Sequence, residues 1–191
     1  MNKLIAITGG IGSGKTSVSK IIKSLGYKVF SADETYSELL NDKSFVKTIY
    51  DALDIKSTNY VFDRKLVANK VFNDNDCLKK LNDITHPLIM KKMLENSKNE
   101  SGVIFNEVPL LFESGYQNLY DEIIVVKRSL EDRVNSVTKR DGISKNDVLA
   151  RINNQYDYEN KLNIEHTLIV NDGSLDKLTS SVKVVLEKIV K

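Results

Sequence analysis

The residues with the clearest chemical potential form a glycine-rich segment near the start of the chain. Residues 9–16 read Gly-Gly-Ile-Gly-Ser-Gly-Lys-Thr and match the pattern G-x-x-x-x-G-K-[ST]. Glycines let successive backbone amides turn inward around phosphate oxygens, Lys15 neutralises the β and γ phosphates, and Thr16 offers a hydroxyl to Mg²⁺. A short apolar run precedes the segment and a helical pattern follows it. This context predicts a phosphate loop that binds a nucleotide.

A phosphate loop identifies a nucleotide site but not a reaction, because kinases, GTPases and motors share it. The N-K-x-D motif expected for guanine recognition is absent, and no D-x-x-G motif occurs. A motor or an ABC-type ATPase would need a longer chain with segments that couple to partners. A small-molecule kinase remains, beside the alternative of a regulatory protein that hydrolyses ATP slowly.

Two carboxylates lie where apolar runs end. Asp33 follows the run 28–31 and could accept the proton of an acceptor hydroxyl or help to hold Mg²⁺; the alternative is an N-cap for a helix that begins near Glu34. Glu107 ends a later run and is either a second acid near the metal or a partly solvated loop carboxylate. The sequence leaves both alternatives open.

Arginine is rare in this chain and unevenly distributed. Only five of the 28 basic residues are Arg, and four of them, at positions 128, 133, 140 and 151, lie within one 24-residue stretch. Arg140 and Arg151 flank a turn between two expected helices and could close over a nucleotide as a lid, or could be solvated. For Arg128 and Arg133 we favour a solvated helix face.

The elements that must position these residues follow an α/β pattern. Two Ser-x-x-Asp sequences, starting at Ser129 and Ser144, predict helix N-termini, and residues 175–189 carry one apolar stripe typical of a closing helix. Residues 34–99 show helical patterns without a core strand, which indicates a helical insertion. Five continuous apolar runs predict a parallel sheet covered on both faces; they span 4–8, 28–31, 103–107, 122–126 and 167–170.

Composition limits the function classes. The chain has 191 residues, 41% of them hydrophobic, and a formal net charge of +2, which favours one globular domain and argues against nucleic-acid or membrane-surface binding. One cysteine, Cys77, excludes an internal disulfide, and with two histidines zinc chemistry is not expected. We expect a soluble, cytoplasmic protein without an obligate protein partner.

Taken together, these residues resemble the dephospho-CoA kinase family along nearly the whole chain. The most specific matches are His86-Pro87, the segment Pro-Leu-Leu-Phe-Glu at 109–113, and Arg151 with Gln155. Asp63-Arg64, Arg140-Asp141 and residues 171–173 extend the resemblance. Two positions depart from the family pattern, since Ser31 and Glu107 stand where Asp is frequent.

The resemblance implies transfer of the ATP γ-phosphoryl group to the ribose 3′-hydroxyl of dephospho-CoA, with Mg²⁺, in the last step of coenzyme A synthesis. It implies a three-layer α/β/α P-loop kinase domain over residues 1–191, with a nucleotide-binding core at 1–33, 100–137 and 158–191, an acceptor region at 34–99 and a lid at 138–157. The implied catalytic residues are Asp33, Lys15 and Arg140. ATP would meet Gly10, Ile11, Gly12, Ser13, Gly14, Lys15, Thr16, Ser17, Arg140, Asn171 and Gly173; dephospho-CoA would meet Asp33, Arg64, His86, Pro109 and Leu110; the metal would meet Thr16 and Asp33.

Overall fold

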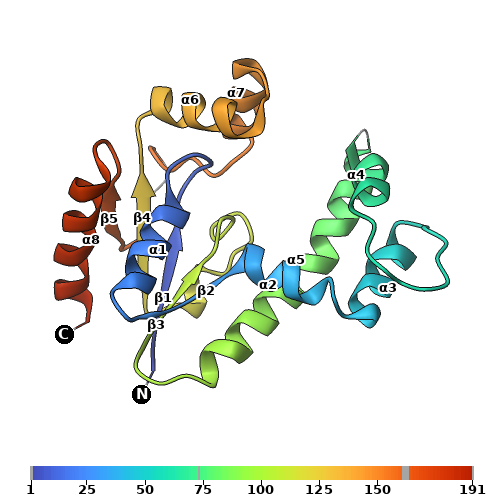
Figure 1. Ribbon diagram of the computed structural model, residues 1–191, viewed down its shortest axis with the longest axis horizontal. Helices are drawn as coiled ribbons and strands as arrows, with labels where there is room; N and C mark the ends of the chain where they lie inside the picture. Colours follow the sequence, from blue (N-terminus) through green and yellow to red (C-terminus); the bar gives the residue numbers. More distant parts are fainter. Residues whose placement is uncertain (1, 73, 161–163, 191) are drawn as a thin grey trace. The chain divides into compact units, whose positions relative to one another are not determined.

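The computed structural model describes residues 2–72, 74–160 and 164–190. Within these residues the chain forms two compact units, one of Met1–Phe30 with Ser97–Lys191 and one of Ser31–Asn96. Figure 1 shows their elements, coloured along the chain. No helix in the described ranges is long and apolar enough to cross a bilayer.

The first unit is built on a five-stranded sheet in the order β2-β3-β1-β4-β5. The pairs of β1 with β3, β1 with β4, and β4 with β5 are all parallel. Central strands are buried on both faces, as the continuous apolar runs require. The strands are β1 (Lys3–Thr8), β2 (Lys28–Ser31), β3 (Val103–Glu107), β4 (Glu122–Lys127) and β5 (Thr167–Val170).

Two helices, α1 (Lys15–Ser24) and α8 (Leu175–Ile189), contact each other and pack on the sheet, where they lie on the same side of the strands (Figure 1). Each presents an apolar stripe at helical spacing, such as Val18, Ile21 and Ile22 in α1. These stripes close the main hydrophobic core against β1 and β4. The sheet therefore supplies a rigid base for the loop between β1 and α1.

Two further helices of this unit, α6 (Leu130–Asp141) and α7 (Lys145–Asn153), contact each other and form what we call the α6/α7 hairpin. Ser129 and Ser144 cap the two helices, since each hydroxyl accepts a hydrogen bond from the backbone N–H three residues later. A short 3₁₀ helix, η1 (Gln117–Leu119), precedes β4.

The second unit is helical. It contains α2 (Ala32–Leu39), α3 (Lys43–Ala52), α4 (Arg64–Phe72) and most of α5 (Asn75–Lys98). Its core gathers Phe45, Ile49, Tyr50 and their neighbours. The Tyr50 hydroxyl donates to the Val61 carbonyl at 2.8 Å and accepts from the Asp63 N–H at 2.8 Å, so it ties the segment before α4 to this core.

The expected α/β fold class is confirmed, and each of the five predicted runs forms a strand. The sequence left the strand order open, and in the structure β3 lies between β1 and β2. Of the two alternatives for Asp33, the N-cap is excluded, because α2 begins at Ala32 and its N-cap is Ser31.

Candidate active site

The phosphate loop leaves the carboxyl end of β1 and enters α1 within six residues. Gly14, the N-cap of α1, has φ 95° and ψ 24°, a left-handed conformation that favours glycine. The Lys15 ammonium donates to the carbonyl oxygens of Gly9 at 2.8 Å and Gly10 at 3.2 Å. Its positive charge therefore lies against the start of the loop.

Side chains from distant parts of the sequence bind the loop backbone. The Ile11 N–H donates to Oε1 of Gln155 at 2.7 Å, and the Ile11 carbonyl accepts from Nε of Arg133 at 2.9 Å. The Asn171 amide donates to the Ser13 carbonyl at 2.9 Å. We call Arg133, Gln155 and Asn171 the loop brace. These bonds satisfy part of the loop's polar backbone without phosphate, while the Ser13 hydroxyl is buried with no protein partner in the described residues.

The loop brace explains why two loop positions hold glycine. A Cβ atom on Gly10 would lie 2.3 Å from Nη2 of Arg133, and one on Gly14 would lie 2.1 Å from Nδ2 of Asn171. Either side chain would have to move to admit even a methyl group. Glycine at these positions thus serves contact with the brace as well as backbone geometry.

Thr16 and Glu107 bring two side-chain oxygens together at the base of the loop. The Thr16 hydroxyl donates to Oε1 of Glu107 at 2.8 Å, and Glu107 is only 3% exposed. Mg²⁺ prefers oxygen ligands and is usually held by one or two carboxylates together with substrate phosphates. The donor set fits that ion, and the described part of the chain has no cluster of three or more His, Cys, Asp or Glu side chains that could hold a metal.

Arg140 lies at the end of α6 and pairs with its neighbour. Its Nε and Nη2 atoms donate to the two carboxylate oxygens of Asp141 at 2.6 and 2.9 Å, while Nη1 of Arg151 lies 3.7 Å from the same carboxylate. The Arg140 hydrogen bond lowers the pKa of Asp141 below its usual range. Arg140 remains largely exposed, so its fork is accessible from solvent.

The segment after the α6/α7 hairpin packs against the Pro-Leu-Leu-Phe-Glu sequence. Phe112 stacks near Tyr156 with ring centroids 4.7 Å apart, and Oε1 of Glu113 accepts from the Tyr156 N–H at 2.9 Å. The Tyr158 hydroxyl lies 3.2 Å from Oγ1 of Thr8, and burial raises the pKa of Tyr158. This anchoring fixes Gln155, which lies just before the two tyrosines.

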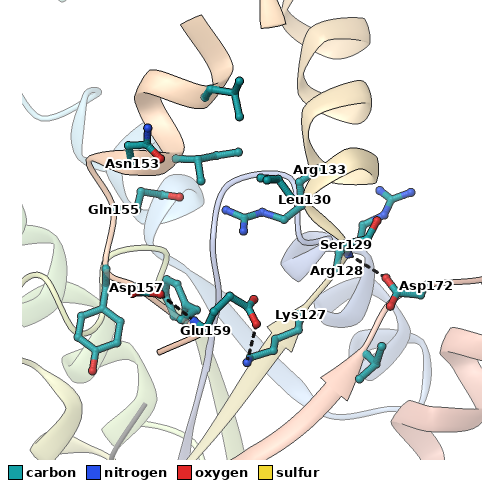
Figure 2. A pocket seen from close by; sticks show the side chains of 15 residues that line it. Lys127, Arg128, Ser129, Leu130, Arg133, Asn153, Gln155, Asp157, Glu159 and Asp172 are labelled. Atoms are coloured by element: carbon teal, nitrogen blue, oxygen red, sulfur yellow. Dashed lines mark hydrogen bonds and ion pairs between the residues drawn. The ribbon is translucent and has the colours of Figure 1, made fainter. Parts of the chain in front are cut away.

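A cavity of about 910 Å³ lies between the start of α6 and the segment 153–159 (Figure 2). Arg133 projects into it, and Lys127 pairs with Glu159 at 3.1 Å across its floor. On the other side the Asp172 carboxylate accepts from the Ser129 N–H at 3.0 Å. The cavity thus adjoins the loop brace and carries charges of both signs.

The structure gathers residues 10–17 and Asn171 around the loop, while Gly173 lies in the turn between β5 and α8. Pro109 and Leu110 form a half-buried turn after β3. In the second unit, Asp33 is exposed in the first turn of α2 and Arg64 is exposed at the start of α4, which Asp63 caps. His86 is half-buried in α5, and burial lowers its pKa.

The position of Arg133 differs from the one expected from the sequence. A solvated helix face was expected, but Arg133 is 8% exposed and contacts the phosphate loop. Its position carried a signal, because Arg133, Val134 and Val137 share the buried stripe of α6. Gln155 belonged to the matching pattern but had no assigned role; its contact with Ile11 supplies one.

The sheet order, the phosphate loop on a central strand and the helix that follows it define a protein with the fold of P-loop kinases. A crystal structure of shikimate kinase from Bacteroides thetaiotaomicron has the same fold, with a TM-score of 0.54 at 11% identity over 98% of both chains.

Closer comparisons define the family. The profile of the family described as dephospho-CoA kinase matches residues 3–177. A dephospho-CoA kinase from Thermus thermophilus is 34% identical over 188 residues, 97% of this chain and 91% of that protein. The structure of dephospho-CoA kinase from Campylobacter jejuni has a TM-score of 0.67 at 28% identity, over 99% of this chain and 98% of that one. The chain belongs to the dephospho-CoA kinase family, which confirms the expected kinase with an alcohol acceptor and ATP as phosphoryl donor.

Proposed function

We propose that this chain transfers the γ-phosphoryl group of ATP in line to the ribose 3′-hydroxyl of dephospho-CoA, giving CoA and ADP, with the residue roles given below. The observation that supports ATP as the phosphoryl donor is the phosphate loop. Side chains hold its backbone in place, and Lys15 lies beside it. Membership of the dephospho-CoA kinase family supports dephospho-CoA as the acceptor.

The loop amides and Lys15 bind the phosphates of ATP. The helix N-terminus of α1 adds unpaired backbone donors and a favourable dipole for anions. Arg140 supplies a planar fork of donors to the transferring group, for which it must exchange the carboxylate of Asp141 for phosphate oxygens. Such preorganised charge stabilises the transition state of phosphoryl transfer.

Asp33 orients the attacking hydroxyl and accepts its proton. Its exposed position in the first turn of α2, three residues after Phe30, leaves its carboxylate accessible to an acceptor.

Asp63 sets the first turn of α4 and so the place of Arg64. We assign Arg64, His86, Pro109 and Leu110 to dephospho-CoA, and Asn171 with Gly173 to the adenine side of ATP.

Thr16 and Asp33 would hold Mg²⁺, and the contact of Thr16 with Glu107 adds a second carboxylate close to the hydroxyl. When bound, the ion supplies positive charge that offsets charge on the β and γ phosphates. Glu107 keeps the Thr16 hydroxyl in a defined place on the loop. We assign this reaction to the cytoplasm without an obligate protein partner, and the near-neutral charge of the chain argues against nucleic acid as a partner.

A coupled assay of ADP release tests the acceptor. Purified protein with ATP and Mg²⁺ is offered dephospho-CoA, AMP, adenosine, shikimate or no acceptor, and the product mass is measured. We expect ADP only with dephospho-CoA, and a product heavier by one phosphoryl group. Turnover with another acceptor would indicate a different small-molecule kinase, and release without any acceptor would indicate an ATPase.

A further inference from the structure

Arg133 is an unusual residue for the interior of α6. It is 8% exposed and lies on the same helix face as Val134 and Val137. A buried guanidinium requires partners, because burial disfavours its charged form and lowers the pKa of Arg133. Glu159 and Tyr158 act in the opposite direction, and the Ile11 carbonyl accepts the Nε–H at 2.9 Å.

Ile11, at the tip of the phosphate loop, is held from three directions. Its carbonyl binds Arg133 of α6, and its N–H binds Gln155 after α7. Its side chain packs on the apolar cluster of Val134, Val137 and Val148 inside the α6/α7 hairpin. Backbone and side chain of one loop residue therefore depend on the same hairpin.

We propose that Arg133 is a positioning residue for phosphoryl transfer, which fixes the phosphate loop through the Ile11 carbonyl and so couples the loop to the α6/α7 hairpin. The inference rests on the proposed function of the loop as the ATP phosphate site.

The geometry explains why arginine suits this position. Nε donates to the Ile11 carbonyl, while Nη2 lies only 2.3 Å from where a Cβ of Gly10 would be, so the planar group contacts the loop at both residues. The remaining donors of the fork line the cavity that also holds Glu159 (Figure 2). Lysine could supply one donor but not a planar surface over the loop.

The first test compares Arg133→Met and Arg133→Lys with the wild-type chain. Methionine keeps most of the apolar stem but removes the donors, and we expect KM for ATP to rise about tenfold while KM for dephospho-CoA stays within about twofold. The Arg133→Lys variant keeps one donor, so its KM for ATP should lie between those of the wild-type chain and Arg133→Met. Lys20→Met removes one charge from the exposed face of α1 and is the matched control.

A second variant perturbs the same contact from the loop side. Gly10→Ala places a methyl group 2.3 Å from Nη2 of Arg133, so the fork must move although residue 133 is still arginine. We expect the same selective rise in KM for ATP. Hydrogen exchange of the Ile11 amide should become faster in Gly10→Ala and Arg133→Met, with exchange in α8 unchanged.

The kinetic results distinguish a failure of the role proposed for Arg133 from a failure of the proposed kinase function. Equal changes in both KM values, or a fall in melting temperature with unchanged KM values, would reduce Arg133 to a structural residue and overturn the proposal. If the wild-type chain does not phosphorylate dephospho-CoA, the proposed function fails. Calorimetric titration of Mg-ADP into the same variants then still tests Arg133, and unaltered ADP affinity would overturn its role.

Discussion

At the scale of single residues, the phosphate loop depends on donors and acceptors that come from far along the chain. Lys15 and Thr16 belong to a contiguous motif, so their chemistry follows directly from their spacing. Arg133 and Asn171 reach the loop only through tertiary packing, at sequence separations of 122 and 158 residues. Local pattern could not predict those contacts. From the sequence alone a solvated helix face is favoured for Arg133, and only the buried stripe that it shares with Val134 and Val137 shows that its side chain faces inward.

Replacing Asp33 by Asn tests the hydroxyl-orienting carboxylate. The amide keeps the size of the side chain but cannot accept the proton, so we expect kcat to fall about 10² to 10⁴-fold with little change in ATP affinity. Steady-state kinetics with both substrates varied measures this. Glu38→Gln, on the exposed face of the same helix, is the control. Near-normal turnover in Asp33→Asn would remove Asp33 from the chemical step.

The contact between Thr16 and Glu107 predicts a specific metal dependence. Thr16→Ser keeps the hydroxyl and its bond, and we expect normal Mg²⁺ activation. Glu107→Gln removes a negative charge beside that hydroxyl, so half-maximal activity should require about tenfold more Mg²⁺. Titration of Mg²⁺ at saturating ATP measures the change. An identical Mg²⁺ requirement in Glu107→Gln would show that Glu107 only supports the fold.

At the scale of elements, the α6/α7 hairpin combines a fixed part and an accessible part. Its apolar cluster and Arg133 contact the loop, whereas Arg140 at the end of α6 is exposed and paired with Asp141. Its helix starts were predictable because a Ser-x-x-Asp sequence caps a helix locally. The place of β3 between β1 and β2 was not, because strand order is set by long-range pairing.

Arg140→Lys tests the exposed end of the hairpin. Lysine retains the charge but loses the two parallel donors that now bind Asp141, so we expect kcat to fall at least about tenfold with a modest change in KM for ATP. Single-turnover measurements with saturating ATP isolate the chemical step. Arg151→Lys is the comparison, since Arg151 lies 3.7 Å from the same carboxylate. An unchanged rate in Arg140→Lys would limit Arg140 to a surface ion pair.

At the scale of the whole molecule, stability at high pH depends on buried tyrosines. Burial raises the pKa of Tyr120 from 10.0 to about 12, although the Asn106 amide donates to its hydroxyl at 3.3 Å. The folded chain then retains a proton that the unfolded chain loses. This contribution is fully present below pH 10 and is lost as pH rises toward 12; it amounts to roughly 2 kcal/mol.

We therefore expect Tyr120→Phe to flatten the fall in unfolding free energy between pH 10 and 12. Urea denaturation at several pH values in this range measures it. Tyr116→Phe, from the same segment, controls for the removal of a phenol hydroxyl as such. Equal slopes for Tyr120→Phe and the wild-type chain would show that Tyr120 titrates alike in the folded and unfolded chain.

The position of β1 in the middle of the sheet also affects how the chain is made. Its partners β3 and β4 are encoded late, and Val103 comes 95 positions after Thr8. At a translation rate of about 5 to 20 residues per second, the first strand waits about 5 to 20 seconds for its first neighbour. Residues 31–96 leave the ribosome during that wait and form a compact unit with a core of their own. We therefore expect the nascent chain to build its helical unit first, while the apolar strand β1 is still unpaired and accessible to chaperones.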